Sequence, residues 1–78
     1  MNNKNQSQIN LAWVIATCQD ILGLNNLKAE DDFFDLGADS LTVIKLFARI
    51  EREYGANKIN IDWLFEQSRL EQIAVLLG

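Results

Sequence analysis

The stretch GADSLTVIKLF, residues 37–47, decides the fold because a polar loop changes into a helix within it. Gly37 can adopt backbone angles that other residues avoid, so it suits a sharp turn. Asp39 and Ser40 are both favourable helix N-caps. From Leu41 onward the apolar residues recur at helical spacing, which predicts a helix beginning at Ser40. Ser40 is therefore either a helix cap or a hydroxyl presented for chemistry.

The predicted helix runs from Ser40 to about Tyr54 and ends at Gly55. With successive residues about 100° apart, its large apolar side chains form one stripe that faces the core. This stripe holds Val43, Leu46, Phe47, Ile50 and Tyr54. A second, smaller apolar face beside Ser40 holds Leu41, Ile44 and Ala48, and a basic strip next to it holds Lys45, Arg49 and Arg52. The small face predicts a partner-docking patch, and packing under the preceding loop is the alternative.

An earlier helix is predicted to begin at Ser7 or Gln8, after a flexible polar segment at residues 1–7, and to end at Leu22 before Gly23. Its core stripe holds Leu11, Val14, Ile15, Cys18, Ile21 and Leu22.

Trp13 lies with Ile9 and Ala16 on the opposite side of this first helix. An exposed aromatic there would suggest a second contact surface, because aromatic residues are enriched at binding hot spots. The competing interpretation, which is favoured, is that Trp13 packs on the last helix or on the long loop.

Two more helices follow, a short one at residues 61–67 and a last one that begins at Ser68. In the last helix SRLE matches the capping box, with Ser68 as the cap and Glu71 three residues later. Its buried stripe is predicted to hold Leu70, Ile73, Ala74 and Leu77.

A long loop, residues 24–39, joins the first two helices. Asp32 is predicted to cap a turn in DDFFDLG, and Phe33, Phe34 and Leu36 to pin this turn to the core. The fold class is therefore all-α: a small four-helix bundle of three main helices and one short helix, with a long loop between helices 1 and 2.

Size and composition restrict the function. The 78 residues form one domain, and 49% of them are hydrophobic, which suits a globular fold. A net charge of −4 argues against nucleic acid as a partner. No apolar run approaches the roughly 20 residues of a membrane span, and no signal peptide is visible, so a cytoplasmic protein without a membrane partner is expected. The single Cys18 is expected to be a core residue.

Catalysis by Ser40 itself is not expected. A serine nucleophile needs a base, most often histidine, and this chain has no histidine. The loop acids Asp31, Asp32, Asp35 and Asp39 lack the spacing of a calcium loop, so no metal is expected. A hydroxyl that cannot activate itself is still open to modification by another enzyme.

Two stretches resemble the phosphopantetheine-binding carrier proteins, which include acyl carrier proteins and the peptidyl carrier domains of nonribosomal peptide synthetases. These stretches are DDFFDLGADSLTVIKLFARIEREYG, residues 31–55, and LFEQSRLEQIAVLL, residues 64–77. The resemblance covers about residues 8–77, so residues 8–78 are taken as a carrier domain. A proline-threonine pair common in the family is replaced by Gln67 and Ser68.

The resemblance implies that Ser40 is the attachment site, with Gly37, Asp39 and Leu41 completing the motif. A phosphopantetheinyl transferase would esterify Ser40 with 4′-phosphopantetheine from coenzyme A, and the thiol of this arm would carry acyl or aminoacyl groups as thioesters. A phosphodiester at a helix N-terminus gains about 0.3–1 kcal/mol at an exposed site, although Asp39 opposes part of this gain.

The resemblance also implies the partners: the transferase, an acyl- or aminoacyl-loading enzyme, and downstream synthase or synthetase enzymes. Leu41, Ile44, Lys45 and Ala48 are the residues expected to recognise them, on a monomeric protein. The slightly basic helix after Ser40 departs from the acidic helix of fatty-acid carriers and favours polyketide or nonribosomal peptide biosynthesis.

Two alternatives stay open at this point. The chain is either an acyl or a peptidyl carrier, and either free-standing, as its initial methionine favours, or an excised domain. An unmodified helical interaction module, in which Ser40 is only a cap, is the competing function.

Overall fold

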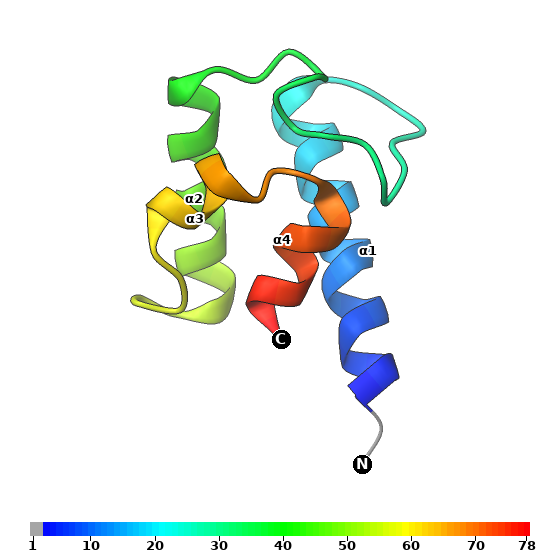
Figure 1. The fold of residues 1–78 in the computed structure, drawn as a ribbon, viewed down its shortest axis with the longest axis vertical. Helices are drawn as coiled ribbons and strands as arrows, with labels where there is room; N and C mark the ends of the chain where they lie inside the picture. The colour runs from blue at the N-terminus through cyan, green and yellow to red at the C-terminus, as the bar shows by residue number, and fades with distance from the viewer. Residues whose placement is uncertain (1–2) are drawn as a thin grey trace.

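The computed structural model describes residues 3–78, with side chains described from Gln6 onward. It contains four helices: α1 (Asn3–Leu22), α2 (Ser40–Tyr54), α3 (Ile61–Glu66) and α4 (Leu70–Leu77). The long loop crosses the top of the molecule from the end of α1 to the start of α2 (Figure 1). Within residues 3–78 the only β-type pairing is an isolated bridge between Asp32 and Arg69. The predicted all-α bundle of three main helices and one short helix is confirmed.

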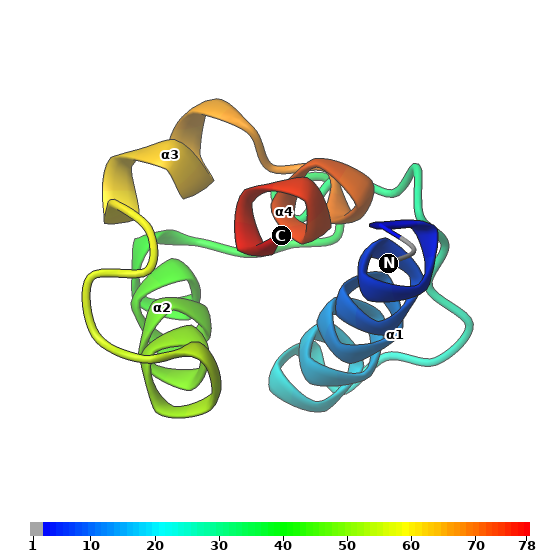
Figure 2. The same ribbon diagram turned by 90° about the horizontal axis from the view of Figure 1, so that it is seen from below.

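The helices α1 and α2 lie side by side, α4 lies over both of them, and α3 lies next to α2 and α4 (Figure 2). The hydrophobic core fills the space between them and holds Val14, Cys18, Phe33, Val43, Leu46, Ile50, Ile59, Leu64, Leu70, Ile73, Ala74 and Leu77. The predicted bounds of α2 and the buried stripe of α4 are confirmed. Within residues 3–78 no helix is both long and apolar enough to cross a membrane.

The start of α1 was predicted wrongly. The helix begins at Asn3, several residues before Ser7, whereas its end at Leu22 and the positive φ of Gly23 agree with the prediction. The flexibility of residues 1–7 stays a prediction, and residues 1 and 2 lie outside the described part of the chain.

The buried face of α1 includes two polar residues that the apolar pattern missed, Asn10 and Thr17. Asn10 is fully buried, and although its Nδ2 has no hydrogen-bond partner among the described residues, its Oδ1 accepts hydrogen bonds from Tyr54 Oη at 2.8 Å and from Gln6 Nε2 at 2.9 Å. A buried polar group is tolerated when it is paired in this way. The face of α1 that packs on the bundle is therefore rotated towards α2.

Trp13 is part of this rotated face. Its side chain is half-buried against the core, and its ring centroid lies 5.1 Å from that of Tyr54 in an edge-to-face arrangement. The hypothesis of an exposed contact surface at Trp13 is therefore wrong. The favoured packing interpretation holds, and the ring pair with Tyr54 adds a contact with the end of α2 that was not predicted.

Cys18 is a core residue, as predicted, and is fully buried. Burial raises the pKa of its thiol to about 12, because the thiolate would lose its hydration.

The predicted capping box at Ser68 is wrong. The helix α4 begins at Leu70, with Arg69 as its N-cap, and Gln72 Oε1 accepts a hydrogen bond from the Arg69 N–H at 3.2 Å. Ser68 is instead buried between α3 and α4, where its Oγ donates to Asp32 Oδ2 at 2.8 Å. A serine hydroxyl can bond either to the backbone of a helix that follows it or to another side chain. Here the Ser68 hydroxyl bonds to the Asp32 carboxylate in the loop and not to the backbone of α4.

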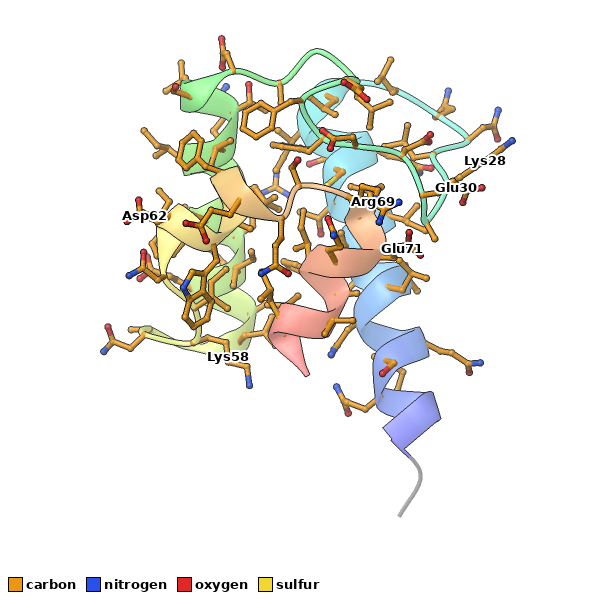
Figure 3. The ribbon with its side chains drawn as sticks, in the orientation of Figure 1. Lys28, Glu30, Lys58, Asp62, Arg69 and Glu71 are labelled. Carbon is orange, nitrogen blue, oxygen red and sulfur yellow. The ribbon has the colours of Figure 1, made fainter. Side chains whose placement is uncertain are left out.

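Backbone hydrogen bonds join the loop to the start of α4. The N–H groups of Leu70 and Glu71 donate to the carbonyls of Asp31 and Ala29 at 3.0 and 2.9 Å. Figure 3 shows Arg69 and Glu71 beside the part of the loop that carries Lys28 and Glu30. Because the first N–H groups of a helix have no partner within it, the loop serves as the cap of α4.

Asp32 caps the DDFFDLG turn, as predicted, by accepting hydrogen bonds from the N–H groups of Phe34 at 2.9 Å and Asp35 at 3.4 Å. Phe33 is buried and Phe34 packs on the core, whereas Leu36 is only half-buried. Burial raises the pKa of Asp32, but the hydrogen bonds from Ser68, Phe34 and Asp35 outweigh this effect and lower it overall.

We expect Ser68→Ala to lower the free energy of unfolding by about 1–2 kcal/mol, since it removes a half-buried hydrogen bond to a carboxylate. Urea denaturation followed by circular dichroism measures the change. Ser7→Ala, at an exposed position of α1, is the matched control and should have little effect. Equal stability of the two variants would contradict a structural role for the Ser68–Asp32 bond.

Candidate functional site

Ser40 is the first residue of α2 and its side chain is exposed. It stands where the long loop ends, at one end of the bundle (Figure 1). The hydroxyl is therefore open to an enzyme that approaches from solvent.

Asp39 is the N-cap of α2. Its Oδ1 accepts hydrogen bonds from the Thr42 N–H at 2.9 Å and from Thr42 Oγ1 at 2.8 Å. These bonds from the Thr42 backbone and hydroxyl lower the pKa of the Asp39 carboxyl. Since the cap of α2 is Asp39, the Ser40 hydroxyl is not needed for capping.

The backbone before Asp39 is fixed by the turn. Gly37 has a φ of 107°, a conformation that residues with a side chain rarely adopt. Its N–H donates to the Phe34 carbonyl at 3.0 Å, and the N–H of Ala38 donates to the Phe33 carbonyl at 3.3 Å. The predicted sharp turn at Gly37 is confirmed, and it connects the buried Phe33 to the exposed Ser40 within a few residues.

The small apolar face of α2 is exposed. Leu41 is 60% exposed and Ile44 is 53% exposed, and the neighbouring Lys45 and Ala48 are exposed as well. This confirms that these residues do not pack under the loop. Their use by partners stays a prediction.

The sequence did not predict that the end of α1 lies beside the basic strip of α2. Asp20, near the end of α1, forms an ion pair with Arg49 of the basic strip, with Oδ2 2.7 Å from Nη2. The two residues lie far apart in sequence, so only the docking of α1 on α2 reveals the pair.

The Ser40 hydroxyl lacks the usual groups that activate a serine nucleophile. The chain has no histidine, and the nearest carboxylate in sequence, Asp39, is engaged with Thr42. Among the residues whose side chains are described, no three carboxylate, thiol or imidazole groups gather as metal ligands. The arrangement suits a hydroxyl that another protein modifies.

A family model described as "Phosphopantetheine attachment site" matches residues 12–77. The chain belongs to this family. Its members carry 4′-phosphopantetheine as a prosthetic group.

The relatives of this phosphopantetheine attachment domain are very large proteins. It is 36% identical over 61 residues to tyrocidine synthase 2 of Brevibacillus parabrevis, an alignment that covers 78% of this chain and 2% of the relative. It is 34% identical over 62 residues to the hybrid PKS-NRPS synthetase mycA of Thermothelomyces thermophilus, and this alignment covers 80% of this chain and 2% of the relative. It is 34% identical over 64 residues to the isonitrile lipopeptide synthase of Streptomyces coeruleorubidus, and this alignment covers 82% of this chain and 4% of the relative. The chain thus spans a small fraction of the proteins it matches.

The residues at the head of α2 fit the prosthetic group. The group needs one accessible hydroxyl, which Ser40 offers, and a place for a phosphate. The positive end of the α2 dipole provides this place, and the Asp39 carboxylate is turned back onto Thr42 by two hydrogen bonds. Apolar Leu41 stands next to the serine and is exposed.

We expect Asp39→Ala to lower the melting temperature at pH 7, because α2 loses its cap. A carboxyl whose pKa is lowered by folding stabilises the protein above its unfolded pKa of about 3.9, and this contribution disappears as the pH falls through the folded pKa. The melting difference from wild type should therefore shrink below about pH 4. Thermal denaturation from pH 7 to pH 2.5 checks this, and a difference that grows in acid would contradict it.

Proposed function

We propose that the chain is a carrier protein of natural-product biosynthesis that holds acyl or aminoacyl intermediates and delivers them to partner enzymes. The observation that carries this proposal is the exposed Ser40 at the capped start of α2, in a chain of the phosphopantetheine attachment family. The peptide and polyketide-peptide synthases among its relatives favour a nonribosomal peptide or polyketide pathway.

In this proposal Ser40 Oγ is the atom that forms the ester with 4′-phosphopantetheine, supplied by coenzyme A through a phosphopantetheinyl transferase. The terminal thiol of the bound group supplies the thioester linkage for the cargo. Gly37 and Asp39 fix the position of Ser40, Gly37 through its turn and Asp39 through its bonds to Thr42. The chain itself makes and breaks no bond of the cargo.

Leu41, Ile44, Lys45 and Ala48 form the proposed recognition surface, since all four are exposed on one side of α2 next to Ser40. Exposed apolar side chains that adjoin one another are typical of contact sites when they form a contiguous patch. The partners are the transferase, a loading enzyme and downstream synthase or synthetase enzymes.

We expect the wild-type chain to gain one phosphopantetheine mass on incubation with coenzyme A and a broad-specificity phosphopantetheinyl transferase. Ser40→Ala should fold as wild type and gain no mass, because the attachment oxygen is gone. Ser7→Ala is the control and should be modified normally. Intact-mass spectrometry decides the matter. A wild-type chain that stays unmodified would favour the competing function, an interaction module in which Ser40 only begins a helix.

We expect Ile44→Ala to change the free energy of unfolding by less than about 0.5 kcal/mol, the usual effect at a surface, but to slow modification of Ser40 several-fold. The matched control is Ile9→Ala, since Ile9 is 61% exposed on α1 and should affect neither stability nor modification. The measurements are urea denaturation and the kcat/KM of the transferase. A loss of about 2–5 kcal/mol with unchanged kcat/KM would instead make Ile44 a core residue.

A further inference from the structure

An open groove of about 360 Å³ lies between the end of α1 and the middle of α2. It is lined by Asp20, Ile21, Lys45, Ala48, Arg49 and Arg52. Three of the seven basic residues of the chain line this one groove, although the net charge of the whole chain is −4. The groove is therefore a basic region on a chain that is acidic overall.

The positive charge in the groove is only partly neutralised. Arg49 is paired with Asp20 at 2.7 Å. Lys45 and Arg52 are exposed and form no ion pair within 4.0 Å among the side chains that the structure describes. Two cations thus remain for an outside anion, and the Asp20 carboxylate shows that the groove can hold a carboxylate.

The cations follow the helix axis at a regular spacing. Lys45, Arg49 and Arg52 are separated by four and three residues, which corresponds to about 6 Å and about 4.5 Å along α2. Carboxylates at the same spacing on one face of another helix would lie opposite them. The apolar Ile21 and Ala48 lie in the same groove and offer contact to an aliphatic side chain of that helix.

We propose that this groove binds an acidic amphipathic helix of a partner protein, whose carboxylates pair with Lys45 and Arg52 and compete with Asp20 for Arg49. Charge complementarity and the helical spacing of the cations select this occupant, in the manner of helix-in-groove recognition. The inference rests on the proposed carrier function only for the kind of partner, a protein that processes the cargo. The binding surface itself does not involve Ser40.

The Asp20–Arg49 ion pair distinguishes binding in the groove from a general attraction between opposite charges. Because Asp20 occupies Arg49 in the free protein, Asp20→Asn should release this guanidinium and strengthen binding of an acidic helix about two- to fivefold, as expected for one exposed ion pair. Lys45→Gln combined with Arg52→Gln should weaken binding about four- to 25-fold, since two such pairs are lost.

The test uses the 78-residue chain carrying Ser40→Ala, so that modification cannot contribute. The probe is a synthetic peptide of about 18 residues, long enough to be helical, with a leucine stripe flanked by glutamates four and three residues apart. A second peptide carries lysines in place of the glutamates. Titration of ¹⁵N-labelled protein followed by NMR gives the Kd and maps the amides that shift.

We expect the acidic peptide to shift amides of Ile21, Lys45, Ala48 and Arg52, to bind more weakly as salt rises, and to bind better than the lysine peptide. The matched control is Lys28→Gln combined with Lys58→Gln, which removes the same charge from the loop and from the segment before α3 (Figure 3). This control variant should bind the acidic peptide with a Kd within about twofold of that of the chain carrying Ser40→Ala alone. Circular dichroism melting of each variant ensures that only folded proteins are compared.

Three results would overturn the proposal: shifts that lie on another surface, an equal loss of affinity in the Lys28 and Lys58 control, or no gain in Asp20→Asn. The mass assay at Ser40 is a separate measurement. A chain that binds the peptide but is never modified would refute the carrier function alone, and a chain that is modified but ignores the peptide would refute the groove alone.

Discussion

The hydrogen bonds between the long loop and the start of α4 are the constraint on which the rest of the structure depends. The helix α4 has no side-chain cap of the common Ser, Thr or Asp type, and the carbonyls of Ala29 and Asp31 take its first N–H groups instead. In return the Phe33 N–H donates to the Ser68 carbonyl at 2.8 Å, and Ser68 Oγ donates to Asp32. The loop and α4 therefore order each other. A segment of this length would otherwise lose much conformational entropy for few contacts, and the position of α2 follows from where the loop ends.

This arrangement separates the two tasks of α2. Its inner stripe, with Val43, Leu46 and Ile50 fully buried, fixes the helix against the core. Its outer side keeps apolar Leu41 and Ile44 next to charged groups, where they contribute little to folding. Other large apolar side chains are exposed as well, among them Ile9 and Val75, so Leu41 and Ile44 are distinguished by their position beside Ser40 and not by exposure alone.

Much of this could be predicted from the sequence where the signal is local. The bounds of α2 follow from Asp39, Gly55 and the apolar period, and the stripe of α4 follows from its own period. The errors arise where a distant partner decides. Ser68 caps nothing because Asp32, 36 residues away, takes its hydroxyl. Trp13 is half-buried and Asn10 fully buried because both meet Tyr54, 41 and 44 residues further along. An apolar periodicity counts asparagine as a surface residue, so it predicted the wrong inner face for α1. It also cannot reveal the Asp20–Arg49 ion pair that borders the groove, because the two residues are on different helices.

The burial of Cys18 has a chemical consequence for a protein of this family. Its thiol is the only one in the chain, it lies inside a packed core, and burial raises its pKa to about 12, which disfavours the reactive thiolate at neutral pH. Electrophiles such as maleimides react with exposed thiolates, so the polypeptide itself offers them almost nothing. A prosthetic thiol on Ser40 would then have no competitor within its own protein. Reactivity of the folded protein towards thiol reagents would then come from a prosthetic thiol and not from Cys18.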